Sequence, residues 1–251
     1  MILSPFNPIF FLGDRRCPGI ECPYTQLFGC DDTILIEVIR AADETPCAVT
    51  LVNAETGEDV MVLARRTISI GSGEYADCYD MSGVPDGFYF LAIGEDESET
   101  FRVTSDPEML RYTCLIEYSP AENKARRDVI GIANGERIYF SFRIPGGFKD
   151  NGWSFSVENE QFVTQFSDIV ELYGRESCQY ILTMGHGEGV PIWFGDLLNR
   201  LLTCKYVYID GKRYARSESS VPEKEQTIDG TNSFVFTQKL QRINYIEPTK
   251  S

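Results

Sequence analysis

Apolar and polar residues alternate in short runs through the first half of the chain. Between residues 33 and 106, segments such as TILIEVIRA and GFYFLAIGE place apolar side chains at every second position, as in Ile34, Ile36 and Val38. A period of two is typical of strands with one buried face, and turn residues separate the runs at a fairly even spacing. We therefore predict a small antiparallel β-sandwich domain over residues 33–106.

A second block of strand-like segments follows a break at residues 105–111, where SDPEMLR carries a proline. The segments TCLIEYS, RIYFSFRIPGG and FVFTQKL alternate again, and several runs in this block end in glycine-rich turns. We predict a larger β domain over residues 107–251. The fold class expected for the whole chain is mainly β, with two antiparallel β-sandwich-like domains.

One segment of the second block has the period of a helix instead. Pro191 occupies a start position, and apolar residues recur behind it at spacings of three and four. These residues are Trp193, Leu197, Leu198, Leu201 and Leu202. We predict a short amphipathic helix over residues 191–204 that packs on a sheet. The next segment, YVYIDGKRY, places Asp210-Gly211 between two strand-like arms, which predicts a two-residue hairpin turn.

Residues 1–32 show neither period and are rich in proline, glycine and cysteine. We predict an extended N-terminal arm. So many aromatic side chains on an irregular segment must be buried, either against this protein's own body or against a neighbour. The interface candidates are Phe6, Phe10, Phe11, Tyr24 and Phe28. The C-terminal strand FVFTQKL is a further segment expected to reach a neighbour.

The charge and hydropathy of the chain exclude several classes of partner. A formal net charge of -15 argues against direct nucleic-acid binding, because that binding depends on Lys and Arg neutralising phosphates. No apolar run approaches the roughly 20 residues that a membrane-spanning helix needs. Arg15 and Arg16 follow the apolar start instead of preceding it, which is the wrong order for a secretory signal, so we expect synthesis in a cytoplasm.

Eight cysteines are present, most of them alone in apolar segments, as expected of buried thiols in a reducing compartment. The exceptions are Cys17, Cys22 and Cys30. Three interpretations stay open for them: a zinc site, a Cys17–Cys22 disulfide, or free thiols. Free thiols fit best, because zinc sites usually show tighter pairs and four ligands, and the only histidine, His186, is far away in sequence. We expect no metal and no cofactor.

No catalytic constellation is evident. His186 and Glu188 lie in the loop GHGEG, but the lysine and hydroxyl residue of a phosphate-binding loop are missing, and neither GxSxG nor HExxH occurs. We therefore expect no catalytic residues and no enzyme. Trp153, on a turn in KDNGWSF, is a glycan-contact candidate, which makes a carbohydrate-binding or host-adhesion module the alternative function.

Four segments carry a resemblance to a known group of proteins. They are CPYTQLFGCDDTILIEV, TCLIEYSPAEN, GHGEGVPIWFGDLLNRLLTCKYVYIDGKRYARSESSVPE and FVFTQKLQRINY. These resemble structural tail proteins, of the baseplate, tail-hub or connector type, from phages and prophages of gut Bacteroidetes. The resemblance implies a non-enzymatic virion component of the tail that forms a homo-oligomeric ring and contacts other tail proteins.

Overall fold

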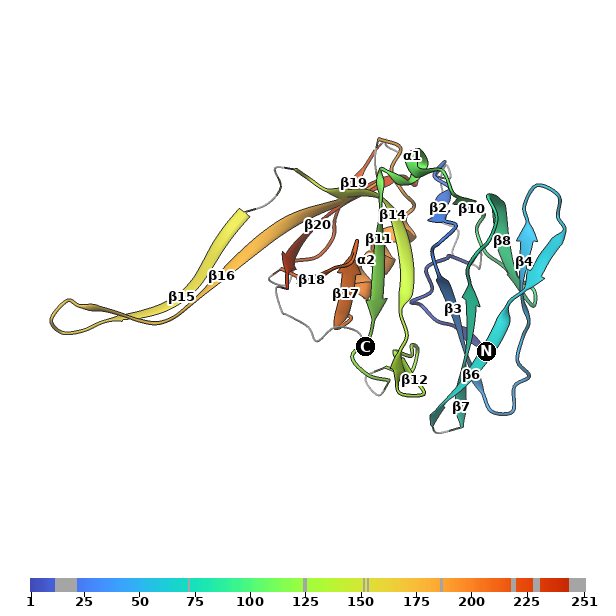
Figure 1. The fold of residues 1–251 in the computed structure, drawn as a ribbon, viewed down its shortest axis with the longest axis horizontal. Coiled ribbons are helices and arrows are strands. Elements are labelled where there is room, and N and C mark those ends of the chain that lie inside the picture. Colours follow the sequence, from blue (N-terminus) through green and yellow to red (C-terminus); the bar gives the residue numbers. More distant parts are fainter. Residues whose placement is uncertain are drawn as a thin grey trace.

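The computed structural model describes residues 1–11, 22–71, 73–123, 126–150, 152, 154–185, 187–217, 220–227 and 231–243. The fold is mainly β, as the alternation predicts. Within the described residues the strands form sheets of four, six, eight and two strands, accompanied by two short helices (Figure 1). In this part of the chain, neither helix is long and apolar enough to cross a bilayer.

The four-stranded sheet has the order β1-β3-β7-β6. Its strands are β1 (Ile2–Leu3), β3 (Ile34–Ala41), β6 (Ala64–Gly71) and β7 (Glu74–Met81). Almost every side chain of β3 is buried, because the sheet is a middle layer. Ile34 and Ile36 pack into one hydrophobic core, whereas Leu35 and Ile39 belong to the core on the opposite face.

The six-stranded sheet follows the order β2-β10-β8-β4-β5, with β9 paired to β8. Its strands are β2 (Gln26–Gly29), β4 (Val49–Asn53), β5 (Asp59–Val62), β8 (Gly87–Ile93), β9 (Asp96–Glu97) and β10 (Phe101–Thr104). Leu51, Leu91 and Phe101 share a core with Ile36 and Tyr79 of the four-stranded sheet, so the two sheets form a sandwich.

Residues 1–32 contribute two short strands to these sheets, which corrects the expectation of an extended arm. β1 pairs with β3, and β2 pairs in parallel with β10. Phe6 and Phe28 are fully buried in the two cores. Strands of two and four residues are too short to display an alternating period, which is why the sequence pattern did not reveal them.

The eight-stranded sheet has the order β15-β16-β14-β11-β17-β18-β20-β19. Its strands are β11 (Thr113–Ser119), β14 (Phe140–Phe148), β15 (Ser154–Val163), β16 (Ile169–Met184), β17 (Tyr206–Ile209), β18 (Lys212–Arg216), β19 (Glu223–Gln226) and β20 (Phe234–Arg242). β16 also pairs with β20. This pairing closes the sheet on itself through six strands, which are β16, β14, β11, β17, β18 and β20. β12 (Ile132–Ala133) and β13 (Glu136–Arg137) make the separate two-stranded sheet.

β20 carries the segment FVFTQKL, which we expected to reach a neighbour. It instead lies inside the sheet, with β16, β18 and β19 all hydrogen-bonded to it. Phe236 and Leu240 are buried in the core. The segment is therefore part of the body of the protein and its backbone is not an open edge.

The predicted helix and hairpin are both present. α2 (Ile192–Leu201) is preceded by Pro191 at the N-cap, and it buries Leu197, Leu198 and Leu201 as the spacing predicts. The helix is shorter than the predicted range 191–204. β17 and β18 are joined by Asp210 and Gly211, whose φ angles of 47° and 74° suit the predicted two-residue turn. At the proline-containing break, Pro107–Leu110 forms the short helix α1, capped by Asp106.

Among the polar contacts between the sandwich and the second half of the chain, two involve buried carboxylates. Asp32, which follows β2, accepts two hydrogen bonds of 2.7 Å from the guanidinium of Arg143 on β14. Glu37 of β3 accepts hydrogen bonds of 3.1 and 3.2 Å from the backbone N–H of Ile130 through its two carboxylate oxygens. One hydrophobic core extends across the same junction and includes Phe6, Leu35 and residues of the eight-stranded sheet.

Candidate functional site

A long hairpin made by β15 and β16 projects from the body of the molecule (Figure 1). Only residues 179–184 of β16 pair with β20, and residues 182–184 also pair with β14. From Ile169 to Cys178, the pairing of β16 is with β15 alone. The outer part of the hairpin is therefore a two-stranded ribbon beyond the rest of the sheet.

Hydrogen bonds define the tip of this hairpin. The backbone N–H of Thr164 donates to the carbonyl of Asp168 at 2.9 Å, and that of Ser167 donates to the carbonyl of Thr164 at 3.0 Å. Ser167 has a φ of 67°, in the left-handed region that a tight turn uses. The two strands are thus joined by a closed turn, which fixes their register.

One face of the projecting ribbon is apolar. Directly paired residues share a face and successive residues alternate, so Phe155, Val157 and Val163 of β15 lie on the same side as Ile169, the partner of Val163. The members of this apolar face are Phe155, Val157, Val163 and Ile169. Their exposed fractions lie between 66% and 77%.

The same face of β16 is the core face inside the body. Counting every second residue along β16 from Cys178, the partner of Phe155, leads to Leu182 and Met184, which are fully buried. The hydrophobic face of the sheet therefore runs out of the body and continues uncovered along the hairpin.

The opposite face is mixed. Glu160, Phe162, Val170 and Tyr173 lie on it by the register of the pairing, and all four side chains are exposed. Gln161 and its partner Glu171 interrupt the apolar face near the tip, and the turn residue Phe166 is 79% exposed.

The exposed apolar surface of the hairpin costs free energy in water, which indicates that it binds a partner. Each square ångström of apolar surface left in water forgoes about 25 cal/mol of burial free energy. A two-stranded ribbon is only marginally stable without a further layer on its apolar face. Contiguous apolar patches on a folded protein mark interaction sites. The hairpin is therefore the best candidate for a binding surface in the described structure.

The interface candidates expected in the N-terminal segment are largely used inside the chain. Phe6 and Phe28 are fully buried, so they are not available to a neighbour, which corrects that expectation. Phe10 stacks on Trp193 with ring centroids 5.4 Å apart, Tyr24 packs edge-on to Phe194, and Phe11 packs against the sandwich core. The aromatic side chains are half-buried or buried because the protein's own helix and sheets supply their partners.

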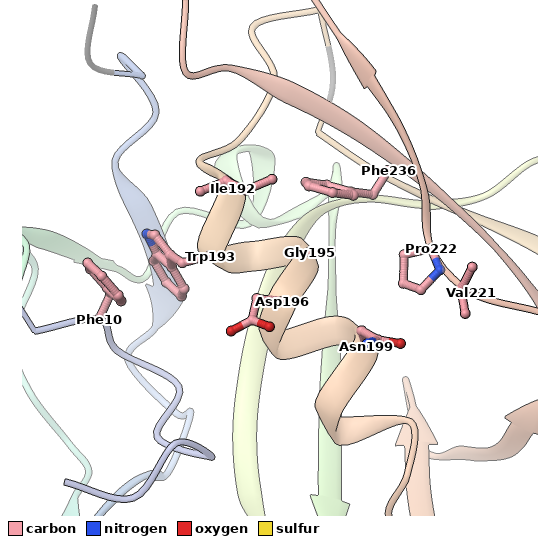
Figure 2. Close-up of a pocket in the computed structure, with 9 residues that line it drawn as sticks. All are labelled: Phe10, Ile192, Trp193, Gly195, Asp196, Asn199, Val221, Pro222 and Phe236. Atoms are coloured by element: carbon pink, nitrogen blue, oxygen red, sulfur yellow. The ribbon is translucent and has the colours of Figure 1, made fainter. Parts of the chain in front are cut away.

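An open groove of about 480 Å³ runs beside α2. It is lined by Phe10, Ile192, Trp193, Gly195, Asp196, Asn199, Val221, Pro222 and Phe236. Figure 2 shows Phe10 and Trp193 on one side of the helix and Phe236 on the other. The indole N–H of Trp193 donates to Glu99 at 3.3 Å, and Asp196 pairs with Arg200 at 2.7 Å. The polar groups beside Trp193 thus have partners inside the protein, and the groove suits a small apolar group.

Three residues singled out from the sequence, Cys17, Trp153 and His186, lie outside the described residues. The predictions of a glycan contact at Trp153, and of the state of Cys17, therefore stay predictions.

The described cysteines are free thiols, Cys22 and Cys30 included. Burial raises the pKa of Cys78, Cys114 and Cys204 to about 12, so these thiols stay protonated and are poor nucleophiles at neutral pH. Across the described ranges, no three His, Cys, Asp or Glu side chains gather in a group suited to a metal ion.

Comparisons with known proteins add little. No family model matches the chain, and no curated protein matches it. Among solved structures, the chain is similar to a Zn-binding triple mutant of the glycoside hydrolase family 9 endoglucanase J30, with 17% identity and a TM-score of 0.23. The match covers 38% of this chain and 19% of the endoglucanase chain. At that TM-score the likeness carries no argument about function.

Proposed function

We propose that this protein is a non-enzymatic structural subunit of a phage tail. Made in the host cytoplasm, it assembles with copies of itself into a ring and contacts other virion proteins of the tail. One observation carries the proposal: the hydrophobic face of a sheet continues, uncovered, along the projecting hairpin β15–β16.

Self-assembly accounts for this hairpin in physical terms. An exposed apolar face is suited to a protein partner, because removing its apolar side chains from water is favourable. When one copy contributes a projection and the next contributes its body, the contact is head to tail. Such contacts close into a ring when the rotation between copies permits.

The place in a phage tail rests on the sequence resemblance, which covers most of the chain. It is consistent with the acidic composition, since a formal net charge of -15 disfavours packing against phosphate backbones. Mass spectrometry of purified tail fractions from the phage or prophage that encodes this chain tests the placement. Recovery of its peptides in stoichiometric amount is expected, and their absence from intact tails would contradict it.

The assembly itself is tested by the double variant Val157→Ser, Ile169→Ser. Both side chains are at least half exposed on the apolar face. Burying such a side chain contributes about 1.5–3 kcal/mol, so the pair is expected to weaken self-association by about 100-fold or more. Sedimentation velocity across a concentration series measures the change.

The control is Gln161→Ser, which shortens a polar side chain on the same face of the hairpin. It is expected to assemble like the wild type. If the double variant assembles as well as Gln161→Ser does, the apolar face is not the assembly surface and the proposal fails.

A further inference from the structure

The end of the molecule opposite the hairpin carries two exposed edge strands (Figure 1). β5 is the last strand of the six-stranded sheet and β6 is the last strand of the four-stranded sheet; Leu63 joins them. All four side chains of β5 are exposed, including Val60, Met61 and Val62. In β6, only Ile68 and Ile70 are partly buried.

β6 and β15 match as partners in pairing. β6 has eight residues and β15 has ten, and each is the terminal strand of its sheet among the described residues. An edge strand presents N–H and C=O groups along one side that no neighbouring strand uses. Adding a strand from another chain to such an edge satisfies these groups, which is a recurring mode of protein recognition.

The charges on the two edges are complementary. β6 carries Arg65 and Arg66, and residues 60–71 contain no acidic residue. On the hairpin, Glu160, Asp168 and Glu171 are exposed. In a chain with a net charge of -15, a basic edge is an exception. Arg66 lies 3.5 Å from Asp80, but both side chains are more than 40% exposed, and such a surface pair is weak enough to exchange.

The same charges discourage the wrong pairings. Two β6 edges would bring arginines together, and two hairpins would bring carboxylates together, so each edge repels its own kind.

We infer that the edge strand β15 of one copy adds to the edge strand β6 of the next copy. The apolar face of the hairpin then covers the exposed apolar side chains of β5. Because the hairpin and the β5–β6 edge lie at opposite ends of the molecule, the contact is head to tail and can repeat around a ring. This inference rests on the proposed self-assembly and names the two surfaces that meet.

A charge exchange in the full-length chain tests the pairing. One variant carries Arg65→Glu and Arg66→Glu; the other carries Glu160→Lys and Glu171→Lys. Each alone is expected to self-associate at least about tenfold more weakly than the wild type, because like charges then face each other. An equimolar mixture is expected to recover association, since each edge meets its complement. Sedimentation velocity at low salt measures both.

The matched control is Lys205→Glu with Lys212→Glu, which changes the net charge by the same amount as the β6 variant. Both lysines are exposed and lie outside β5 and β6. This control is expected to assemble like the wild type, and circular dichroism shows that each variant is folded.

The possible failures of the two proposals are distinguishable. If the wild type assembles and depends on Val157 and Ile169, but the charge variants match the control or their mixture gains nothing, the β6 pairing is overturned and the structural role stands. A wild type that stays monomeric overturns both.

Discussion

At the scale of single residues, the buried carboxyl of Glu37 carries the clearest dependence on pH. It is fully buried at the junction between the sandwich and the eight-stranded sheet. Burial raises the pKa of Glu37 to about 8, and the negative charge of Asp128 adds to the effect, while the hydrogen bond from the backbone N–H of Ile130 opposes it. At neutral pH the folded protein therefore holds this carboxyl mainly in its neutral form.

The sign of the pH effect follows from the raised pKa. Below the ordinary carboxyl pKa near 4.5, Glu37 is protonated in both the folded and the unfolded chain, and its contribution to stability is fully present. As pH rises towards about 8, the unfolded chain releases a proton that the folded chain retains, so this contribution is progressively lost.

We predict that Glu37→Gln removes this loss. Urea unfolding at pH 5 and pH 8 should show the free energy of unfolding falling less with pH in the variant than in the wild type. Glu136→Gln, at an exposed position in β13, serves as the control and should keep the wild-type slope. An unchanged slope in Glu37→Gln would refute the assignment.

The ion pair of Asp32 and Arg143 gives a second prediction at this scale. Its side chains are only 6% and 13% exposed, and Asp32 also accepts a hydrogen bond of 2.7 Å from the N–H of Gly29. Asp32→Asn leaves a buried guanidinium without its counter-charge, which costs about 3–5 kcal/mol. The exposed pair of Asp196 and Arg200 is the control: Asp196→Asn should cost less than about 1 kcal/mol. Equal losses in chemical denaturation would show that burial of the pair is unimportant.

At the scale of elements, the packing of α2 on β20 depends on a glycine. A Cβ atom at Gly195 would lie 2.1 Å from the Phe236 ring. Alanine in place of glycine inside a helix gains about 1 kcal/mol of propensity, but overpacking of this kind costs about 1–3 kcal/mol. Because the clash is far below van der Waals contact, we predict that Gly195→Ala is net destabilising.

The control for this variant is Gly147→Ala in β14. A Cβ atom there meets nothing within 4 Å, so the stability should change little. Thermal unfolding of both variants compares the sites. Equal melting temperatures would show that the helix can shift away from β20 without cost.

The elements differ in how far their sequence predicts them. Helix α2 and the Asp210-Gly211 turn follow from local signals, namely a period near 3.6 and a dipeptide that accepts positive φ. The hairpin β15–β16 alternates as a buried strand does, so its pattern predicts strands but does not tell that one apolar face lies open. Whether a neighbouring layer covers a face depends on the tertiary arrangement, which local alternation does not encode.

Residues 1–32 illustrate the same limit. The aromatic content of this segment correctly predicts that its side chains need partners. It does not decide between an internal and an external partner. The structure places Phe6 and Phe28 in two different cores of the same chain, because β1 and β2 each add to the edge of a sheet.

At the scale of the whole molecule, the chain combines a compact body with a projecting ribbon at one end and open edge strands at the other (Figure 1). The body buries most of its hydrophobic residues in its own cores and leaves the apolar side chains of β5 exposed. The hairpin needs a partner, since its apolar face is the continuation of a core face. The account therefore assigns stability to the body and assembly to the two ends.

The most direct test of this account is the mass of the particle that the full-length wild-type chain forms in solution. Native mass spectrometry and sedimentation over a range of concentrations should show one closed species at an integer multiple of 28.4 kDa, and further increases in concentration should not enlarge it. A solution at ~50 μM that contains only the 28.4 kDa monomer would contradict the account, because a specific assembly should form at this concentration.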